Sequence, residues 1–485
     1  MATRSAPASL TISGLALSRM RIRLEAKNLT LLASALALLT TATPIGAQAP
    51  EPVRTAFLQW AEKSVHPVSD ADLDASTQDL RAIEKMIGDA KIVALSEGIH
   101  GAAEPLIFRN RVFKHLVEHL GFNAIAIESG IVESRLVNDY VTQGKGEFAA
   151  VLKQGLGVGS DTFRQNGELI RWLREYNALL PPDGAKVQFF GLDVPGSPGN
   201  RDAARGPDTA LRSALEYLGV VDPRAAAQMQ SRIEAFLPVL KGTDGYGGLK
   251  QSERDTLTAA IADLVALMER QRLAYVAKSS SDDFDWAQRA AIGARQTDTW
   301  FRRMPVGWKL ADGFDWTSEA QQVRDRVMAD NLDWVRTRLG SHGRVLVFAA
   351  AGHVASTMVV QQVPDHKVRE LIPLGAHLRE RFGAEFVNLL NLVVNGEIKY
   401  CSANPRRSMP LKPPPEPAVE MLFAALNVPR YLLDLRDAPP PVSAWLRQVH
   451  DHWNGFGTQQ FATAGAFDLV YYVSPVTSAC TPTLR

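Results

Sequence analysis

Histidine and carboxylate side chains directly follow four of the most apolar segments of the chain. They are, in order, Glu97 and His100, then Glu128, Asp193 and His353. Imidazole and carboxylate groups that share one site supply either acid–base catalysis or ligands for a metal ion. A single polar residue after a strand more often caps a turn, whereas recurrence after four strands favours a functional site. The pattern therefore predicts that these five side chains converge.

The apolar segments themselves have the length and composition of buried strands. Those that precede the polar residues span 91–95, 123–127, 186–192 and 343–350, and similar segments span 385–394, 431–435 and 467–473. Long amphipathic segments separate most of them, which predicts an α/β protein with a mostly parallel sheet and flanking helices. In an open parallel sheet the carboxyl ends of the strands line one crevice in which ligands bind. We expect the polar residues to face that crevice.

Residues 200–305 have helical periodicity and contain no strand-like segment. We expect helices over 203–218, 224–240, 252–276 and 285–303, with a break at the glycine-rich segment 242–248. Because strand-like segments lie on both sides of this region, it is interpreted as an inserted helical layer or lid. The surrounding α/β domain is expected to span 50–485.

Residues 1–49 have the pattern of an N-terminal extension and signal peptide. Three basic residues between positions 21 and 27 precede an uncharged apolar run at 29–39 and the small-residue cleavage site Ala47-Gln48-Ala49. That run is too short to span a bilayer comfortably. We expect cleavage near Gln48 or Pro50 and a periplasmic or secreted protein with no membrane segment after processing. A retained membrane anchor is the alternative.

The composition is that of an ordinary globular protein. The chain has 485 residues, of which 46% are hydrophobic and 22% charged, and this excludes collagen-like, coiled-coil, disordered and polytopic membrane classes. Beyond residue 49 it holds 48 basic and 51 acidic residues, so we expect no nucleic-acid partner. Two cysteines, Cys401 and Cys480, cannot form a structural zinc-thiolate site, and export predicts that they form a disulfide.

The sequence argues against two other kinds of catalytic site. The chain has no Gly-x-Ser-x-Gly segment, which argues against an ordinary serine esterase of the α/β-hydrolase type. The segment from His115 to His119 matches the His-x-x-Glu-His form of inverted zinc peptidases. The apolar stripe of that helix runs through Phe108, Val112, Leu116 and Leu120, while Arg111, His115 and His119 share another face. We therefore expect a solvated helix face there rather than a zinc site.

The segment Ser96-Glu-Gly-Ile-His-Gly101, with Glu104, Arg109 and then Ala126-Ile-Glu-Ser129, resembles the erythromycin esterase family. The resemblance continues, in order, through 172–177, 190–193, 324–331 and 352–354, and so covers nearly the whole mature chain. It implies a metal-independent hydrolase without a cofactor, in which His100 is the general base that activates water. It further implies Glu97, Arg109, Glu128 and His353 as active-site residues.

The chain departs from the family pattern at the end of the fourth strand. The family usually has His-Asn-Ala-His there, whereas this chain has Ala350-Ala-Gly-His353, so that the first histidine is replaced by alanine. This difference concerns the substrate more than the fold. Macrolide hydrolysis, and the antibiotic resistance that it confers, are implied by the resemblance, but Ala350 predicts weak or no erythromycin hydrolysis. Ser96 also stands where glycine is usual, and a local backbone adjustment is expected.

General chemistry agrees with these roles. Ester hydrolysis at neutral pH needs a base with a pKa near 7, which imidazole supplies. A carboxylate, either Glu97 or Glu128, would fix the tautomer of His100 and stabilise its imidazolium. Arg109 is placed to stabilise the oxyanion if its helix begins near Glu104, and His353 to protonate the leaving alkoxide or hold the substrate.

Three functions remain open at this point. The first is a hydrolase that cleaves a small-molecule carboxylic ester or lactone by water that His100 activates. The second uses His100, His353, Glu97 and Glu128 to bind a divalent metal that hydrolyses esters or phosphoesters. The third is an exported protein that binds a ligand, haem or a polyketide for instance, without turnover.

Overall fold

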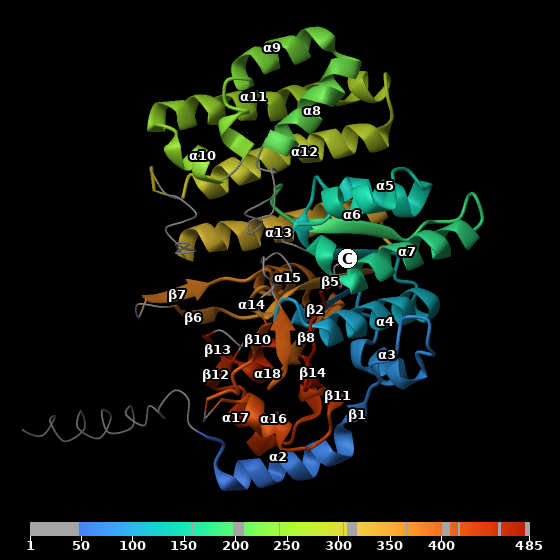
Figure 1. Ribbon diagram of the computed structural model, residues 1–485, viewed down its shortest axis with the longest axis vertical. Coiled ribbons are helices and arrows are strands. Elements are labelled where there is room, and N and C mark those ends of the chain that lie inside the picture. Colours follow the sequence, from blue (N-terminus) through green and yellow to red (C-terminus); the bar gives the residue numbers. More distant parts are fainter. Residues whose placement is uncertain are drawn as a thin grey trace, which may run out of the picture. The chain divides into compact units, whose positions relative to one another are not determined.

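A central sheet with helices on its faces organises the computed structural model (Figure 1). The structure describes residues 48–157, 160–196, 208–241, 243–303, 305–307, 318–363, 367–399, 408–415, 418–453 and 457–480. The apolar run at 29–39 lies outside this range, so the expected signal peptide stays a prediction. No helix of the described residues is long and apolar enough to cross a membrane.

The central sheet has eight strands in the order β1-β11-β14-β8-β2-β5-β3-β4. The strands from β14 to β4 are parallel, and β11 is antiparallel to both of its neighbours. This confirms the predicted α/β class with a mostly parallel sheet. The bounds are β1 His66–Pro67, β2 Ile92–Glu97, β3 Ala124–Gly130, β4 Gln188–Asp193, β5 Val345–Ala350, β8 Phe386–Leu392, β11 Arg430–Asp434 and β14 Leu469–Val473.

Alternate residues of each strand enter two different apolar cores, because successive side chains of a strand point to opposite faces. On β2, Val93 and Leu95 pack against one set of helices, while Ile92 and Ala94 pack against another. The first set is α3 Arg81–Ile87, α4 Ala103–Leu120, α5 Ser134–Gln143, α6 Phe148–Gly155 and α7 Arg164–Leu179. The second set is α2 Glu51–Ser64, α13 Ser318–Leu339, α15 Leu374–Phe382, α16 Glu420–Ala424, α17 Pro440–Leu446 and α18 Thr463–Ala466.

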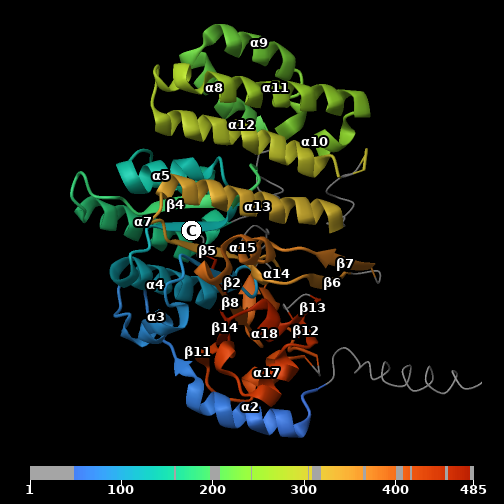
Figure 2. The ribbon, with the colours of Figure 1, turned by 180° about the vertical axis from the view of Figure 1, so that it is seen from behind.

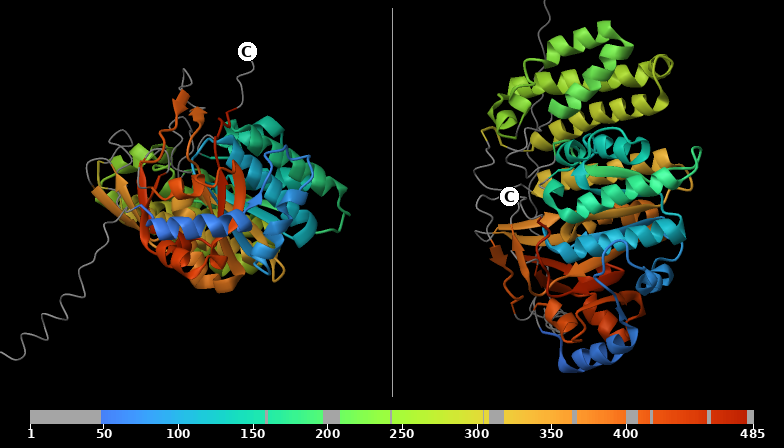
Figure 3. Two further views of the ribbon diagram at one scale, coloured as in Figure 1. Left: turned by 90° about the horizontal axis from the view of Figure 1, so that it is seen from below. Right: turned by 45° about the vertical axis from the view of Figure 1, so that its right-hand side comes forward.

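Among the described residues, five helices between β4 and α13 form a layer around a third apolar core, which also includes Ile131, Val194 and Val327. They are α8 Asp208–Val221, α9 Pro223–Ile233, α10 Thr243–Gly248, α11 Gln251–Val276 and α12 Ser281–Phe301, and they lie together in Figure 2 and Figure 3. Leu218, Leu264 and Trp300 are buried in this core. Asp222 and Ser280 cap α9 and α12 by accepting hydrogen bonds from backbone amides. The glycine-rich segment, expected to be a break, contains the short helix α10.

A second, antiparallel sheet was not predicted. Its order is β12-β13-β6-β7, with bounds β6 Val359–Val363, β7 Lys367–Leu371, β12 Val449–Trp453 and β13 Thr458–Ala462. These strands are short and rich in polar residues, so they lack the apolar runs that reveal the central strands. The small pair β9 Glu397–Lys399 and β10 Ser408–Pro410, the helix α14 Ala351–Val354 and five short 3-10 helices (Gln78–Leu80, Ser160–Thr162, Val239–Lys241, Gly383–Glu385, Leu435–Asp437) complete the described elements.

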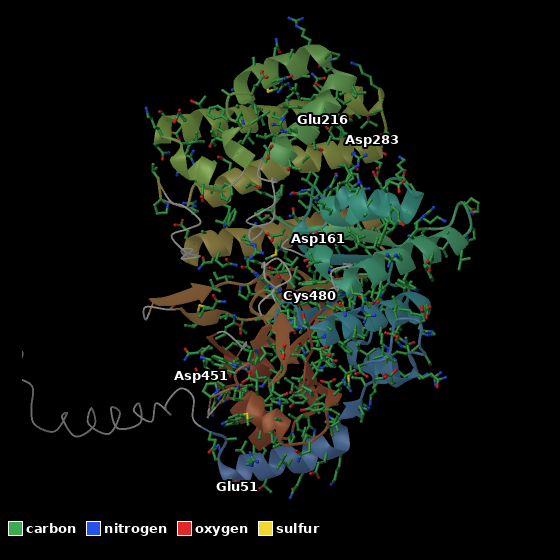
Figure 4. The ribbon with its side chains drawn as sticks, viewed as in Figure 1. Glu51, Asp161, Glu216, Asp283, Asp451 and Cys480 are labelled. Carbon is green, nitrogen blue, oxygen red and sulfur yellow. The ribbon has the colours of Figure 1, made fainter. Side chains whose placement is uncertain are left out.

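Cys480, labelled in Figure 4, pairs with Phe163 through an isolated backbone bridge. It takes part in a disulfide bond. Its expected partner, Cys401, lies outside the described residues.

Candidate active site

The carboxyl ends of four neighbouring strands bring the predicted polar residues together. Glu97 is the last residue of β2, Glu128 lies in β3 and Asp193 ends β4, while His353 lies in α14, directly after β5. The order β2-β5-β3-β4 places these four ends side by side. Glu97 is paired in register with Ala350, so β2 and β5 end level with each other.

The pair formed by Glu97 and His100 lies in the turn between β2 and α4. His100 Nδ1 is 2.8 Å from Glu97 Oε2, and the amide of Gly101 donates to Glu97 Oε1 over 3.3 Å. Glu97 is 7% exposed, whereas 57% of the His100 side chain is exposed. In the neutral ring, Nδ1 carries the proton and donates it in the hydrogen bond to Glu97. Nε2 then keeps its lone pair and makes no hydrogen bond to any described residue.

Asn391, near the end of β8, holds this turn in place. Its side-chain oxygen accepts from the backbone amide of Gly98 over 3.0 Å, and its backbone amide donates to Ser96 Oγ over 2.7 Å. A Cβ atom on residue 98 would lie 2.7 Å from the Asn391 carbonyl oxygen, so the close approach requires glycine. Ser96, which replaces the glycine usual in the family, thus supplies a direct hydrogen bond between β2 and β8.

The environment of His100 shifts its pKa upward. Burial acts to lower the pKa of His100, but the charge and hydrogen bond of Glu97, together with the charge of Glu128, raise it to about 9. The pKa of His100 thus lies above that of an unperturbed imidazole. Because Glu97 holds the proton-bearing nitrogen, the imidazolium is the stable form at neutral pH.

Arg324 of α13 connects three of the strand-end residues. Its Nη2 donates to Glu128 Oε1 over 2.7 Å and to Asp193 Oδ2 over 2.6 Å, and its Nη1 lies 3.0 Å from His353 Nε2. Arg324 and Asp193 are 6% and 0% exposed, so the ion pair is shielded from water. Burial acts to lower the pKa of Arg324, but the two carboxylates raise it further above its already high value. Arg324 is a permanent cation here.

Glu128 is held as an anion. One of its oxygens binds Arg324, and the other accepts from the amide of Ala350 over 2.9 Å. Burial opposes ionisation, but the nearby charges of Arg324 and His100 and the Ala350 hydrogen bond hold the pKa of Glu128 well below its usual range.

His353 is 8% exposed and has a polar neighbour on each side of its ring. Asp325 Oδ1 lies 2.6 Å from Nδ1, and Glu128 Oε1 lies 3.6 Å from Nε2. Asp325 also accepts from the amide of Leu374, at the start of α15, over 2.8 Å. His353 is therefore a buried residue of the site, unlike the exposed His100.

Arg109 lies one turn into α4 and is 1% exposed. Its Nε and Nη2 donate to Asn110, and Nη2 also donates to Asn166 over 2.8 Å. Nη1 makes no hydrogen bond to the described part of the chain. Burial lowers the pKa of Arg109 to about 10, although the charge of Glu97 opposes this shift. Arg109 remains charged at neutral pH, and its guanidinium packs over the ring of Phe348, with Cζ 4.8 Å from the ring centroid.

Arg324 and Asp325 were not predicted as site residues, although both lie in the segment 324–331, which carries the family resemblance. One signal for them is present in the sequence. They lie three to four residues before the core residues Met328 and Ala329 of α13, so a helix places the two charges on its buried face. A charged pair on a buried face needs partners, and the strand-end residues supply them.

The histidine motif on α4 serves a different purpose. His115 is buried, with Nδ1 2.9 Å from Thr77 Oγ1 and Nε2 2.9 Å from Glu84 Oε1. Arg111 is also buried and pairs with Asp79, so the expectation of a solvated face is wrong for both residues. Only His119 of the three is exposed. No group of three or more His, Cys, Asp or Glu side chains within the described residues could hold a metal ion.

Comparison with known proteins agrees with the resemblance. A family model described as erythromycin esterase matches residues 117–474. The chain belongs to the erythromycin esterase family. It is 25% identical over 343 residues to the type II erythromycin esterase of Escherichia coli, a match that covers 69% of this chain and 76% of that protein. The type I enzyme of E. coli is also 25% identical, over 314 residues, with coverage of 62% and 70%. These relatives place the protein in a family of hydrolases.

Solved structures share the fold. A Bacillus cereus protein superposes with a TM-score of 0.73 at 23% identity and covers 88% of this chain and 99% of its own. A point mutant of the erythromycin esterase EreC, in its open conformation, superposes with a TM-score of 0.64 at 18% identity, with coverage of 85% and 97%. At these identities the similarity establishes the fold alone.

Proposed function

We propose that this protein is an exported hydrolase that cleaves a carboxylic ester or lactone with water activated by His100. The observation that carries the proposal is the Glu97–His100 pair, in which Nδ1 is bound and Nε2 is open at an exposed position. This arrangement is the one that a general base requires, because a carboxylate orients the ring and stabilises the cation that forms.

The site residues support a two-step reaction. His100 Nε2 takes a proton from water as the water oxygen bonds to the ester carbon. The carbonyl oxygen becomes negative, and Arg109, a buried cation whose charge interacts with that of Glu97, stabilises it electrostatically. Collapse of the intermediate breaks the bond to the alcohol oxygen, and the imidazolium of His100 returns its proton to that oxygen. General base catalysis of this kind contributes roughly 10²- to 10⁴-fold.

Export is part of the proposal and has separate support. Residues 1–49 carry the signal-peptide pattern, and Cys480 is disulfide-bonded. Disulfides persist in oxidising compartments such as the periplasm. We therefore place the protein in the periplasm or outside the cell.

A screen of purified mature protein against simple esters, lactones and macrolides tests the proposed activity. His100→Ala should lower turnover by at least roughly 100-fold, because the base is lost. His119→Ala changes an exposed histidine of α4 and is the matched control, for which we expect unchanged turnover. Activity of the His100→Ala protein within a few-fold of the unmodified protein would refute the assignment. Loss of activity after chelator treatment, restored by a divalent metal, would instead favour metal-dependent hydrolysis.

A further inference from the structure

Two consecutive residues of α13 hold the ring of His353 from opposite sides. Asp325 Oδ1 is 2.6 Å from Nδ1, and Arg324 Nη1 is 3.0 Å from Nε2. Both residues are buried, at 1% and 6% exposure, and His353 itself is 8% exposed. The ring therefore has little freedom to turn or to exchange these partners for water.

The chemistry of the two partners determines where the proton of His353 lies. A guanidinium has only N–H donors, so Arg324 Nη1 needs a lone pair on Nε2. The Asp325 carboxylate is an acceptor, and it already accepts from the Leu374 amide over 2.8 Å. Nδ1 must then carry the proton. With Arg324 in this position, His353 is a neutral imidazole protonated at Nδ1.

The charges around His353 favour the imidazolium over this neutral form. Burial lowers the pKa of His353, but the charges of Asp325 and Glu128 outweigh it and raise the pKa, while Arg324 opposes them. A proton on Nε2 would, however, point at the N–H of Arg324 at 3.0 Å. The hydrogen-bond direction is the stronger constraint, because the planar guanidinium fixes its hydrogens.

Resting on the function proposed above, we propose that His353 is a positioning residue rather than the acid that protonates the leaving alcohol. Asp325 orients His353, His353 orients the guanidinium of Arg324, and Arg324 holds Glu128 as an anion. Glu128 in turn contributes to the electrostatic environment of His100. The buried series of contacts Asp325–His353–Arg324–Glu128 thus sets the charge near the exposed base. His100 itself returns the proton to the leaving group.

Two substitutions of His353 distinguish the roles. Glutamine offers an oxygen that accepts from Arg324 and an N–H that donates to Asp325, but it cannot transfer a proton as an acid. We expect His353→Gln to retain at least ten-fold more kcat than His353→Ala. Equal loss of kcat in both variants, with both proteins folded, would contradict the positioning role. Asp325→Asn should likewise retain more kcat than Asp325→Ala, and Asp330→Ala, a partly exposed position on the same helix, is the control.

The protonation state of His353 is tested without turnover. Full-length protein labelled with ¹⁵N-histidine should show one ring whose Nδ1 is protonated and whose Nε2 is not at pH 7, and His353→Gln should remove that signal. An imidazolium, or a ring protonated at Nε2, would overturn the proposal. This measurement is independent of whether His100 is the base, so failure of the positioning role and failure of the proposed function give different results.

Discussion

At the scale of single residues, the site divides into one exposed base and a buried set of charges. His100 is 57% exposed at its side chain, whereas Glu97, Asp193 and Asp325 are each less than a tenth exposed. In the proposed reaction the exposed ring meets the substrate, and the charges of Glu97 and Glu128 raise its pKa. The pairing of Glu97 with His100 depends on a separation of three residues after a strand end, which is why it is readable in the sequence. Arg324 and Glu128 are 196 residues apart, and no local pattern connects them.

The first prediction concerns the pH dependence of hydrolysis. Since His100 is a base only after losing its proton, kcat/KM should rise with pH up to the pKa of His100, about 9. Glu97→Gln removes the charge that raises this pKa, so the rise should move to lower pH. The plateau should fall roughly ten-fold or more, because the imidazolium is less stabilised in the transition state.

Profiles of kcat/KM from pH 6 to 10 for both proteins provide the measurement. Glu118→Gln changes an exposed carboxylate of α4 and should leave the profile in place. A rise at the same pH in the Glu97→Gln protein would show that His100 is not the group that titrates.

The second prediction concerns Ala350 and the choice of substrate. Ala350 is the register partner of Glu97, and its amide binds Glu128. At this position of the sequence the family usually has a histidine. We expect weak or no erythromycin hydrolysis, with activity on another ester or lactone. Ala350→His should raise kcat/KM toward hydroxylated macrolactones, because a hydrogen-bonding group is restored beside the alcohol. A change of apolar space alone would alter the discrimination between substrates by only roughly 10- to 200-fold.

Hydrolysis of erythromycin and of the best simple ester by both proteins tests this. Efficient erythromycin cleavage by the unmodified protein would rule out the explanation, since the missing imidazole would then be dispensable.

At the scale of elements, the turn between β2 and α4 depends on two glycines and on a contact with β8. The amide of Gly98 binds Asn391, and Gly101 adopts a positive φ of 88°, so both glycines serve the geometry of His100. The neighbouring strand β8, rather than the turn itself, determines where the histidine lies.

The third prediction follows from this contact. Gly98→Ala would place a methyl group 2.7 Å from the Asn391 carbonyl oxygen, and the turn must shift to relieve the clash. We expect kcat to fall by more than ten-fold and the melting temperature to fall as well. The matched control is Gly219→Ala in α8, where a Cβ meets nothing within 4 Å. That change should leave kcat unaltered and stabilise the protein by roughly 0.4–1 kcal/mol. Full activity of the Gly98→Ala protein would mean that the turn does not position His100.

The elements also show what could be predicted from the sequence and why. The strands of the parallel sheet are buried on both faces, so continuous apolar runs such as Val345–Ala350 were predicted close to their observed bounds. The antiparallel strands β6 and β13 carry polar residues, Gln361 and Gln459 among them, and gave no such signal. Likewise, the convergence of the strand-end residues was predictable from sheet geometry. The contacts from α13 were not predictable in this way. Neither was the pKa of His100, which depends in part on charges from other elements.

At the scale of the whole molecule, the N-terminal helix α2 belongs to the folded domain. It begins at Glu51, directly after Pro50, and buries Phe57 against Phe423 of α16 with ring centroids 5.1 Å apart. Cleavage at either predicted position, Gln48 or Pro50, would leave α2 intact.

The fourth prediction is therefore that exported protein begins at Gln48 or Pro50. Mass spectrometry of intact protein from the periplasm or medium gives the N-terminus. Protein in that fraction that retains Met1 or Met20 would contradict a cleaved signal peptide. A matched sample in which Ala47 and Ala49 are replaced by bulky residues should accumulate uncleaved precursor, because signal cleavage requires small side chains.

The layer formed by α8 to α12 packs around a third apolar core, which it shares with Val194 and Val327. Its caps at Asp222 and Ser280 are internal to the layer. None of the strand-end residues belongs to these five helices, and neither do Arg324 and Asp325. Protein engineers could therefore graft the corresponding helices of a relative onto this sheet without replacing a residue of the candidate site, provided that the contacts with Val194 and Val327 are kept.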